Sequence, residues 1–178
     1  GCVRALATTS EGLLAGGDFT MAGADSAWYV AQWSDSQWSR LPRLFGPVYG
    51  ILELPGDREL SLWVGGRHLR QSTYNHGLMV RRGNMWDYFY PSIQPANPTA
   101  LVYFKNSLVA GGDGNYDPTS RTNGVGRLLM PFVEPQQMGG GVWGQVFALC
   151  VYQGSLYVGG RFEQAGSVVS PHIARWDD

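Results

Sequence analysis

The chain has 178 residues, a formal net charge of −1 and only 15% charged residues. It contains 25 glycines and 13% aromatic residues, a composition typical of a compact all-β protein and unlike that of a disordered chain. Without a basic block or an acidic tail, nucleic-acid binding through concentrated charge is not expected. No apolar run approaches the roughly 18 residues of a membrane-spanning helix, so we expect no membrane insertion.

A glycine doublet that follows a short apolar run occurs four times along the chain. The doublets are Gly16-Gly17, Gly65-Gly66, Gly111-Gly112 and Gly159-Gly160. They are spaced by 49, 46 and 48 residues, and a period of this size predicts one supersecondary unit used repeatedly, above all a β-propeller blade. The apolar run before each doublet is continuous, which indicates a strand covered on both faces. A positive φ at the doublet would explain the glycines, and Gly159→Val would then destabilise the protein strongly.

Each unit is expected to contain a first strand, a tight hairpin, the strand that ends at the doublet, and a third strand. The first strands are predicted at 3–6, 48–51, 98–101 and 146–149. The third strands are predicted fifteen residues after the start of each doublet, at 31–33, 80–82, 126–128 and 174–176. Fourth strands are expected at 37–41, 85–89 and 129–133, and proline-rich linkers separate the units.

These elements predict a single all-β domain over 1–178, with four blades at about 1–45, 46–95, 96–142 and 143–178. The chain starts without Met, which favours a processed chain or a segment of something longer. The fourth unit ends directly after its third strand, so its outer strand is missing. Either the chain continues, or a strand from another molecule completes the blade by β-augmentation. The candidate interface edge is formed by Ile173, Ala174, Arg175 and Trp176.

The fourth unit also carries a resemblance to a known repeat. It has the sequence GSLYVGGRF over 154–162, then Ala165-Gly166, and IARWD over 173–177. This pattern resembles the kelch-like β-propeller repeat of extracellular and cell-surface proteins, the type related to the delta-60 repeat and to the cortical polarity-marker repeats of fungi. The first unit is nearly as similar, whereas the second and third keep little beyond the doublet. The resemblance implies surface adhesion, scaffold or polarity roles and brings no catalytic residues.

An ion ring is a further hypothesis from the repeat alignment. The residues that follow the four doublets alternate in charge, and they are Asp18, Arg67, Asp113 and Arg161. If four blades close a ring, each aspartate lies between two arginines of neighbouring blades. The alternative is coincidence among four positions, and exposed pairs of this kind contribute only about 0–1 kcal/mol each.

No catalytic, metal-binding or cofactor-binding set is predicted. The three histidines show no metal-ligand spacing, and no G-x-S-x-G nucleophile motif occurs. A G-x-G-x-x-G match at 139–144 precedes a predicted strand instead of a helix, so we interpret it as chance. The loop that starts at Asp113 begins like a calcium loop, but it has Pro118 and Gly124 where an EF-hand has glycine and glutamate. We therefore expect no enzyme and no cofactor.

The two cysteines and the tryptophans complete the candidate residues. Cys2 and Cys150 are offset by five residues on parallel inner strands, or roughly 16 Å, which is too far for a disulfide; we expect a buried, free Cys150. Trp28 and Trp143 are the least regular tryptophans and the candidates for exposed aromatic contacts. The predicted function is a non-catalytic structural module of an extracellular or cell-surface assembly, such as a self-associating filament subunit joined by strand exchange. The alternative is a glycan-binding, lectin-like propeller.

Overall fold

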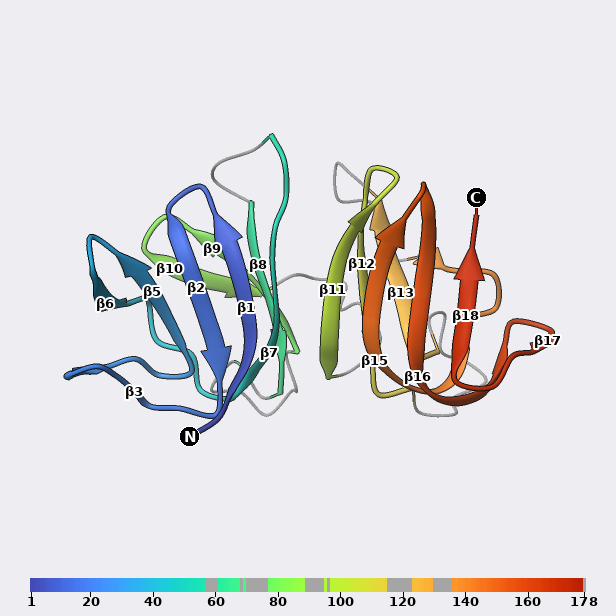
Figure 1. Ribbon diagram of the computed structural model, residues 1–178, viewed down its shortest axis with the longest axis horizontal. Helices are drawn as coiled ribbons and strands as arrows, with labels where there is room; N and C mark the ends of the chain where they lie inside the picture. The colour runs from blue at the N-terminus through green and yellow to red at the C-terminus, as the bar shows by residue number, and fades with distance from the viewer. Residues whose placement is uncertain are drawn as a thin grey trace. The chain divides into compact units, whose positions relative to one another are not determined.

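The structure is a computed structural model that describes residues 1–56, 61–67, 69, 77–88, 95, 97–114, 123–129 and 136–177. The described residues are all-β, with 66% in strands and no helix. Their strands form four larger antiparallel sheets and one small hairpin, and none of the sheets closes on itself. The chain divides into two compact units, Gly1–Phe89 and Tyr90–Asp178, with two of the larger sheets in each (Figure 1). The expectation of an all-β protein is confirmed.

The first unit contains two four-stranded sheets. In the first sheet the spatial order is β1 (Val3–Thr9), β2 (Gly12–Gly17), β5 (Val30–Ser34) and β6 (Gln37–Arg40). In the second sheet it is β7 (Val48–Glu53), β8 (Leu62–Gly66), β9 (Leu78–Arg82) and β10 (Met85–Tyr88). The short strands β3 (Met21–Ala22) and β4 (Asp25–Ser26) form the hairpin between β2 and β5.

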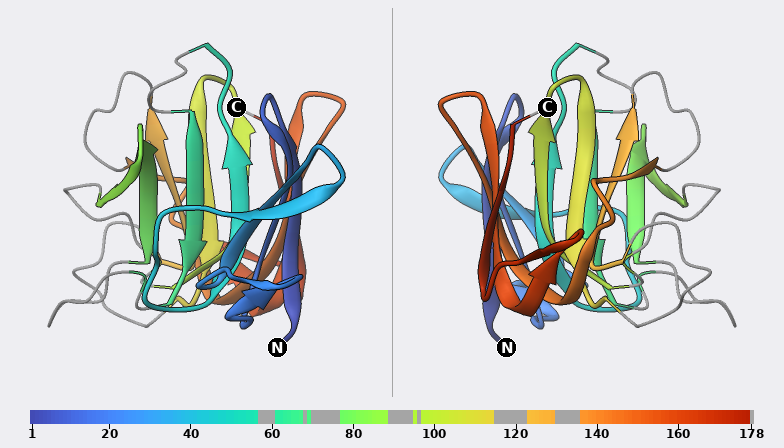
Figure 2. Two further views of the ribbon diagram at one scale, coloured as in Figure 1. Left: turned by 90° about the vertical axis from the view of Figure 1, so that its left-hand side faces the viewer. Right: turned by 90° about the vertical axis from the view of Figure 1, so that its right-hand side faces the viewer.

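The second unit contains the third and fourth sheets. The third sheet has the order β11 (Pro98–Phe104), β12 (Ser107–Gly112), β13 (Val125–Leu129) and β14 (Gln136–Gln137). The fourth sheet contains β15 (Val142–Tyr152), β16 (Ser155–Ala165), β17 (Val168–Val169) and β18 (Ile173–Trp176). Strand β16 pairs with β15 along one side, and with β17 and β18 at different points along the other (Figure 2). Within the described residues, no strand pairs with the outer side of β18.

The repeat predicted from the doublets is present, with two corrections to the strand positions. The first glycine of the doublet lies opposite the residue 14 positions later in three sheets, as in the pair Gly159↔Ile173. In the second sheet, however, Gly65 lies opposite Leu78, so β9 is one residue earlier than the constant offset predicted. In the fourth sheet, β16 continues past its doublet to Ala165. In the third sheet, the strand that the structure describes beside β13 is Gln136–Gln137, and the predicted fourth strand at 129–133 lies, apart from Leu129, outside the described residues.

All four first strands contain a bulge at the same position. The register of each pair shifts between the two residues that lie opposite the glycine doublet, and the residues that the shift skips are Arg4, Tyr49, Thr99 and Phe147. The bulge lies opposite the glycine doublet in every sheet. A bulge bends its strand and increases the local twist. Because the bulge recurs in all four sheets, the four sheets share the same local backbone geometry at this point.

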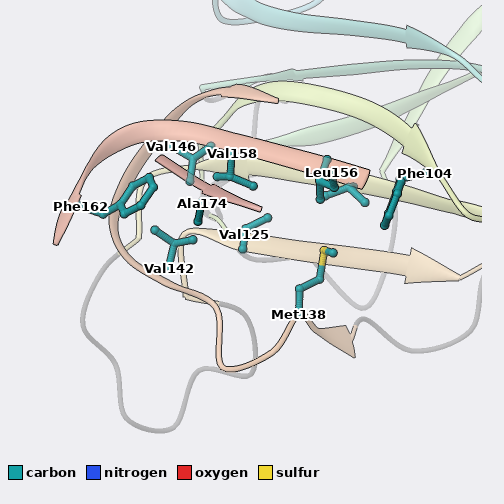
Figure 3. Packing of buried hydrophobic residues seen from close by; sticks show 10 residues of the cluster. Phe104, Val125, Met138, Val142, Val146, Leu156, Val158, Phe162 and Ala174 are labelled. Atoms are coloured by element: carbon teal, nitrogen blue, oxygen red, sulfur yellow. The ribbon is translucent and has the colours of Figure 1, made fainter. Parts of the chain in front are cut away.

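Apolar side chains fill the space between the two sheets of each unit. In the second unit, Val125 of β13 packs with Val146 of β15 and Val158 of β16 in one buried cluster (Figure 3). In the first unit, Leu14 of β2 packs with Val48 of β7 in an equivalent cluster. Burying a valine or leucine side chain is worth about 1.5–3 kcal/mol. Packing between sheets is therefore the main source of stability within each unit.

Candidate interaction site

The second glycine of each doublet makes a close backbone contact within its own sheet. A Cβ atom at this position would overlap the carbonyl oxygen of the residue two positions before the bulge residue, which belongs to Cys2 for Gly17, Pro47 for Gly66, Asn97 for Gly112 and Gln145 for Gly160. Neither Gly159 nor Gly160 has a positive φ. The second position of the doublet is thus glycine because the backbone of the first strand approaches it closely, as happens at glycines in strand interiors. The explanation by a positive φ is wrong.

The first glycine of the doublet contacts the following sheet instead. A Cβ at Gly16 would collide with Val48 and come within 3.1 Å of Ile51. A Cβ at Gly111 would collide in the same way with Val146, and Leu149 would lie 3.4 Å away. In both units a valine and a second apolar residue three positions later therefore fill the space above this glycine. This contact is the centre of the packing between the two sheets of each unit.

Gly159 breaks this rule because the space above it is open. The nearest atom beyond its chain neighbours is the carbonyl oxygen of His172, 4.0 Å from the position of a Cβ. The residue opposite, Ile173, is 61% exposed, whereas its equivalents Val30 and Val125 are 0% exposed. The fourth sheet thus shows to solvent a face that the first and third sheets bury.

We call this surface the Gly159 face and define it by strand register. Alternate residues of paired strands share one face of a sheet. The residues directly opposite Gly159 and Tyr157 on the two neighbouring strands therefore belong to it, and they are Ala148, Cys150, Ile173 and Arg175. All four are exposed, and Tyr157 and Gly159 are half-buried. The face is mainly apolar and has one cationic side chain.

The edge of the fourth sheet adjoins this face. Gly160 donates its N–H to the carbonyl oxygen of His172 at 3.0 Å, so Gly159 and Ile173 form a non-hydrogen-bonded pair. By alternation, the N–H groups of Ile173 and Arg175 point away from β16 toward the outer side of β18. The other two predicted edge residues face inward, since Ala174 is 8% exposed and Trp176 packs against the buried cluster.

Asp177 holds the end of β18 in place. Its carboxylate accepts hydrogen bonds from the Ser155 hydroxyl at 2.6 Å and from the Arg175 guanidinium at 2.9 Å. The Ser155 hydroxyl is the largest influence that lowers the pKa of Asp177 below its ordinary value, and the charge of Arg175 adds to it. Lys105, in the β11–β12 hairpin of the third sheet, donates to the Asp177 carbonyl oxygen at 2.5 Å. The third sheet therefore helps to position the edge strand.

The two aspartates of the predicted ion ring have local partners. The Asp18 carboxylate accepts a hydrogen bond from Arg4 Nε at 2.6 Å, and this bond raises the pKa of Arg4. The Asp113 carboxylate accepts from Asn97 Nδ2 and from Gln145 Nε2, each at 3.0 Å. Asp113 thereby connects the third sheet to the fourth. A closed ring with Arg67 and Arg161 would join both units and stays a prediction.

The two candidate aromatic contacts differ in environment. Trp28 is half-buried, and the guanidinium of Arg43 lies 4.2 Å from its ring centroid. Trp143 is 49% exposed. A guanidinium over an aromatic ring is a cation–π arrangement and occupies the ring face that a sugar would use. Trp143 is the more exposed of the two and on that ground is the better placed for contact with a partner.

The two cysteines differ from the expectation in their exposure. Cys2 and Cys150 are both free, as expected, but both are exposed, so the expectation of a buried Cys150 is wrong. Cys150 is exposed because it belongs to the Gly159 face, which no sheet covers within the described residues. In that same part of the chain, no group of three or more histidine, cysteine, aspartate or glutamate side chains has the arrangement of a metal site. Residues 115–117 of the loop with calcium-like spacing lie outside the described residues.

No protein-family model matches this chain, and no curated protein matches it either. The described residues contain no helix of the length and apolarity that a membrane span requires. The function must therefore be argued from the sheets and their exposed surfaces.

Proposed function

We propose that the chain is a non-catalytic interaction module built as a β-propeller of four kelch-like blades, or as a four-blade stretch of a larger propeller. The fourfold recurrence of the bulge and of the glycine doublet supports this architecture. The sequence resemblance of the fourth unit favours an extracellular or cell-surface assembly. In this proposal the module has a structural role and holds its partner by contacts between sheets and strands.

The observation that carries the proposal is that, among the strands that the structure describes, none pairs with the outer side of β18. In the first sheet, Gln32 is equivalent to Arg175 and pairs with Ser39 of the fourth strand. The outward N–H groups of Ile173 and Arg175 offer the same pairing to an incoming strand. Unpaired edges of this kind bind extended segments through main-chain hydrogen bonds. A strand of the partner would complete the sheet.

A peptide that copies the fourth strand of the first sheet tests this proposal. A fluorescent peptide of residues 36–41 is titrated with the full chain, and binding is measured by polarisation. We expect binding to the natural sequence and to Arg175→Ala, which keeps the backbone donor. Arg175→Pro removes an N–H that points away from β16, so it should abolish binding while the β16–β18 ladder remains. Equal binding by the two variants, or none by the natural sequence, would contradict strand addition.

Glycan binding is the rival function, and one observation favours it. Trp143 is 49% exposed, and an exposed indole is a common surface for stacking against apolar faces of ligands. A glycan array with the natural sequence and with Trp143→Ala separates the two proposals. Glycan binding that is lost in the variant, without any binding of the strand peptide, would favour the lectin-like module.

A further inference from the structure

We propose that the Gly159 face binds the first sheet of a second copy of this chain, with Val3 and Leu6 of the incoming copy filling the space above Gly159. This inference rests on the proposed role as an interaction module in the form of an open four-blade stretch, since a closed ring of four blades would bury both surfaces within one chain. It names the partner and the contact. It concerns the face of the fourth sheet, whereas the peptide experiment above concerns the edge of β18.

The chain itself shows what covers a face of this kind. At Gly16 the covering residues are Val48 and Ile51, and at Gly111 they are Val146 and Leu149. In both cases the pair comes from the bulged first strand of another sheet, with the bulge residue directly after the valine. The partner of Gly159 should therefore be a bulged first strand with an apolar residue before the bulge and a second one three positions later.

The first sheet carries such a pair, and both of its side chains are exposed in the part of the chain that the structure describes. Val3 and Leu6 have the same spacing, and the bulge of β1 falls between Val3 and Ala5. Val3 is 56% exposed and Leu6 is 65% exposed, whereas Val48 and Val146 are 0% exposed. Val3 and Leu6 also lie on one face of the sheet, since they are opposite Gly17 and Ala15. One chain thus exposes both an open glycine face, at Gly159, and an apolar pair, Val3 and Leu6, of the kind that covers such a face within each unit.

The bulge residues add a second complementary feature. In the first unit, the Arg4 guanidinium carbon lies 5.7 Å from the ring centroid of Tyr49, and both are bulge residues of adjacent first strands. The bulge residue of the fourth sheet is Phe147, which is 56% exposed. Packing of a second copy on this sheet brings its Arg4 next to Phe147, where a cation–π contact adds to the apolar burial.

The two surfaces are different, so the contact is head-to-tail. A head-to-tail contact between identical chains produces a ring if its rotation closes and a filament if it does not. It also leaves a free surface at each end of an open assembly. Because of these free surfaces, the assemblies can grow beyond a dimer, which a symmetric dimer cannot do.

Sedimentation velocity over a range of protein concentrations tests the proposal. The natural sequence should form assemblies that grow with concentration. Gly159→Val fills the space above Gly159, and Val3→Asp places a charge in the contact, so each should raise the dissociation constant about tenfold or more. Val169→Asp is the matched control, because Val169 is 81% exposed on β17 and lies outside the face. Circular dichroism establishes that each variant is folded.

A mixture of the two interface variants gives the sharpest result. Val3→Asp keeps the Gly159 face, and Gly159→Val keeps Val3, so an equimolar mixture should form a one-to-one dimer and nothing larger. A monomeric natural sequence at every concentration would overturn the proposal, because it would mean that the two surfaces meet within one chain or bind something else. Assembly that neither substitution weakens, or a mixture that stays monomeric, would also overturn it. Binding of the strand peptide to Val3→Asp is a separate readout, so the proposed function can fail or hold independently.

Discussion

The Cα of Gly160 lies against the carbonyl oxygen of Gln145, so closely that a Cβ would overlap that oxygen. The N–H of Gly160 donates at the same time to His172 on the other neighbouring strand. Gly17, Gly66 and Gly112 have equivalent carbonyl contacts in their own sheets. The second glycine of each doublet therefore allows the first and second strands to approach closely, whereas the first glycine, at Gly16 and Gly111, contacts the next sheet.

Gly160→Ala should destabilise the second unit. Its Cβ cannot be accommodated without moving the backbone of β15 at Gln145, and overpacking of this kind typically costs about 1–3 kcal/mol. Urea unfolding followed by tryptophan fluorescence measures the change in the free energy of unfolding. Glu163→Ala, an exposed position on the same strand, is the control and should stay within about 0.5 kcal/mol. A Gly160→Ala variant as stable as this control would refute the close-contact explanation.

Val146→Ala and Val3→Ala compare two equivalent valines, each directly before the bulge residue of its first strand, of which one is buried and the other exposed. Val146 is 0% exposed between the third and fourth sheets, and Val3 is 56% exposed. Truncating Val146 removes apolar burial worth about 1.5–3 kcal/mol for the whole side chain, so thermal unfolding should occur several degrees lower. Val3→Ala should leave the monomer's stability almost unchanged. Equal losses in the two variants would show that Val3 is buried within the chain.

Both thiols should react in the native protein. Cys2 and Cys150 are free and exposed, so Ellman's reagent should titrate two thiols per chain without denaturant at low protein concentration. At concentrations where the chain assembles, Cys150 should become protected, since it belongs to the Gly159 face. A thiol that appears only after denaturation would contradict the exposed position of its cysteine.

Acid should weaken the fastening of β18 through Asp177. The pKa of Asp177 is lowered in the folded protein, mainly by the Ser155 hydroxyl. Because the pKa is lowered, the ionised carboxylate stabilises the fold at pH values above the ordinary pKa of 3.8. This stabilisation is lost as the pH falls through the pKa of Asp177 in the folded protein. The melting temperature of the natural sequence should therefore fall more between neutral and strongly acidic buffer than that of Asp177→Asn. Identical shifts in the two proteins would argue against the Ser155–Asp177 contact.

The periodicity of the sequence was sufficient to predict the strands but not every register. The doublets and the apolar runs before them depend on local spacing, and three of the four second strands, β2, β8 and β12, end at their doublets as expected, whereas β16 continues to Ala165. Nothing in the sequence indicated the one-residue shift of β9, because the segments that connect each doublet to the third strand have unrelated sequences. The register between β8 and β9 therefore comes from the structure, in which Gly65 pairs with Leu78.

The two glycines of a doublet look alike in the sequence, and their different roles depend on contacts made far along the chain. Gly111 faces Val146, which is 35 residues away, and no local pattern indicates that contact. Burial of Cys150 was inferred from its place on a first strand, yet burial of that face requires a further sheet. Likewise, the position of Arg43 over Trp28 depends on a loop conformation that composition does not encode.

The most direct measurement compares Gly111→Ala with Gly159→Ala in urea unfolding, at a protein concentration low enough to keep the chain monomeric. The two glycines occupy the same position in consecutive sheets, but only Gly111 is covered by a valine of the next sheet. We predict that Gly111→Ala lowers the free energy of unfolding by about 1–3 kcal/mol, and that Gly159→Ala changes it by less than about 0.5 kcal/mol. Equal destabilisation by the two substitutions would mean that Gly159 is already covered, and would contradict an open face on the fourth sheet.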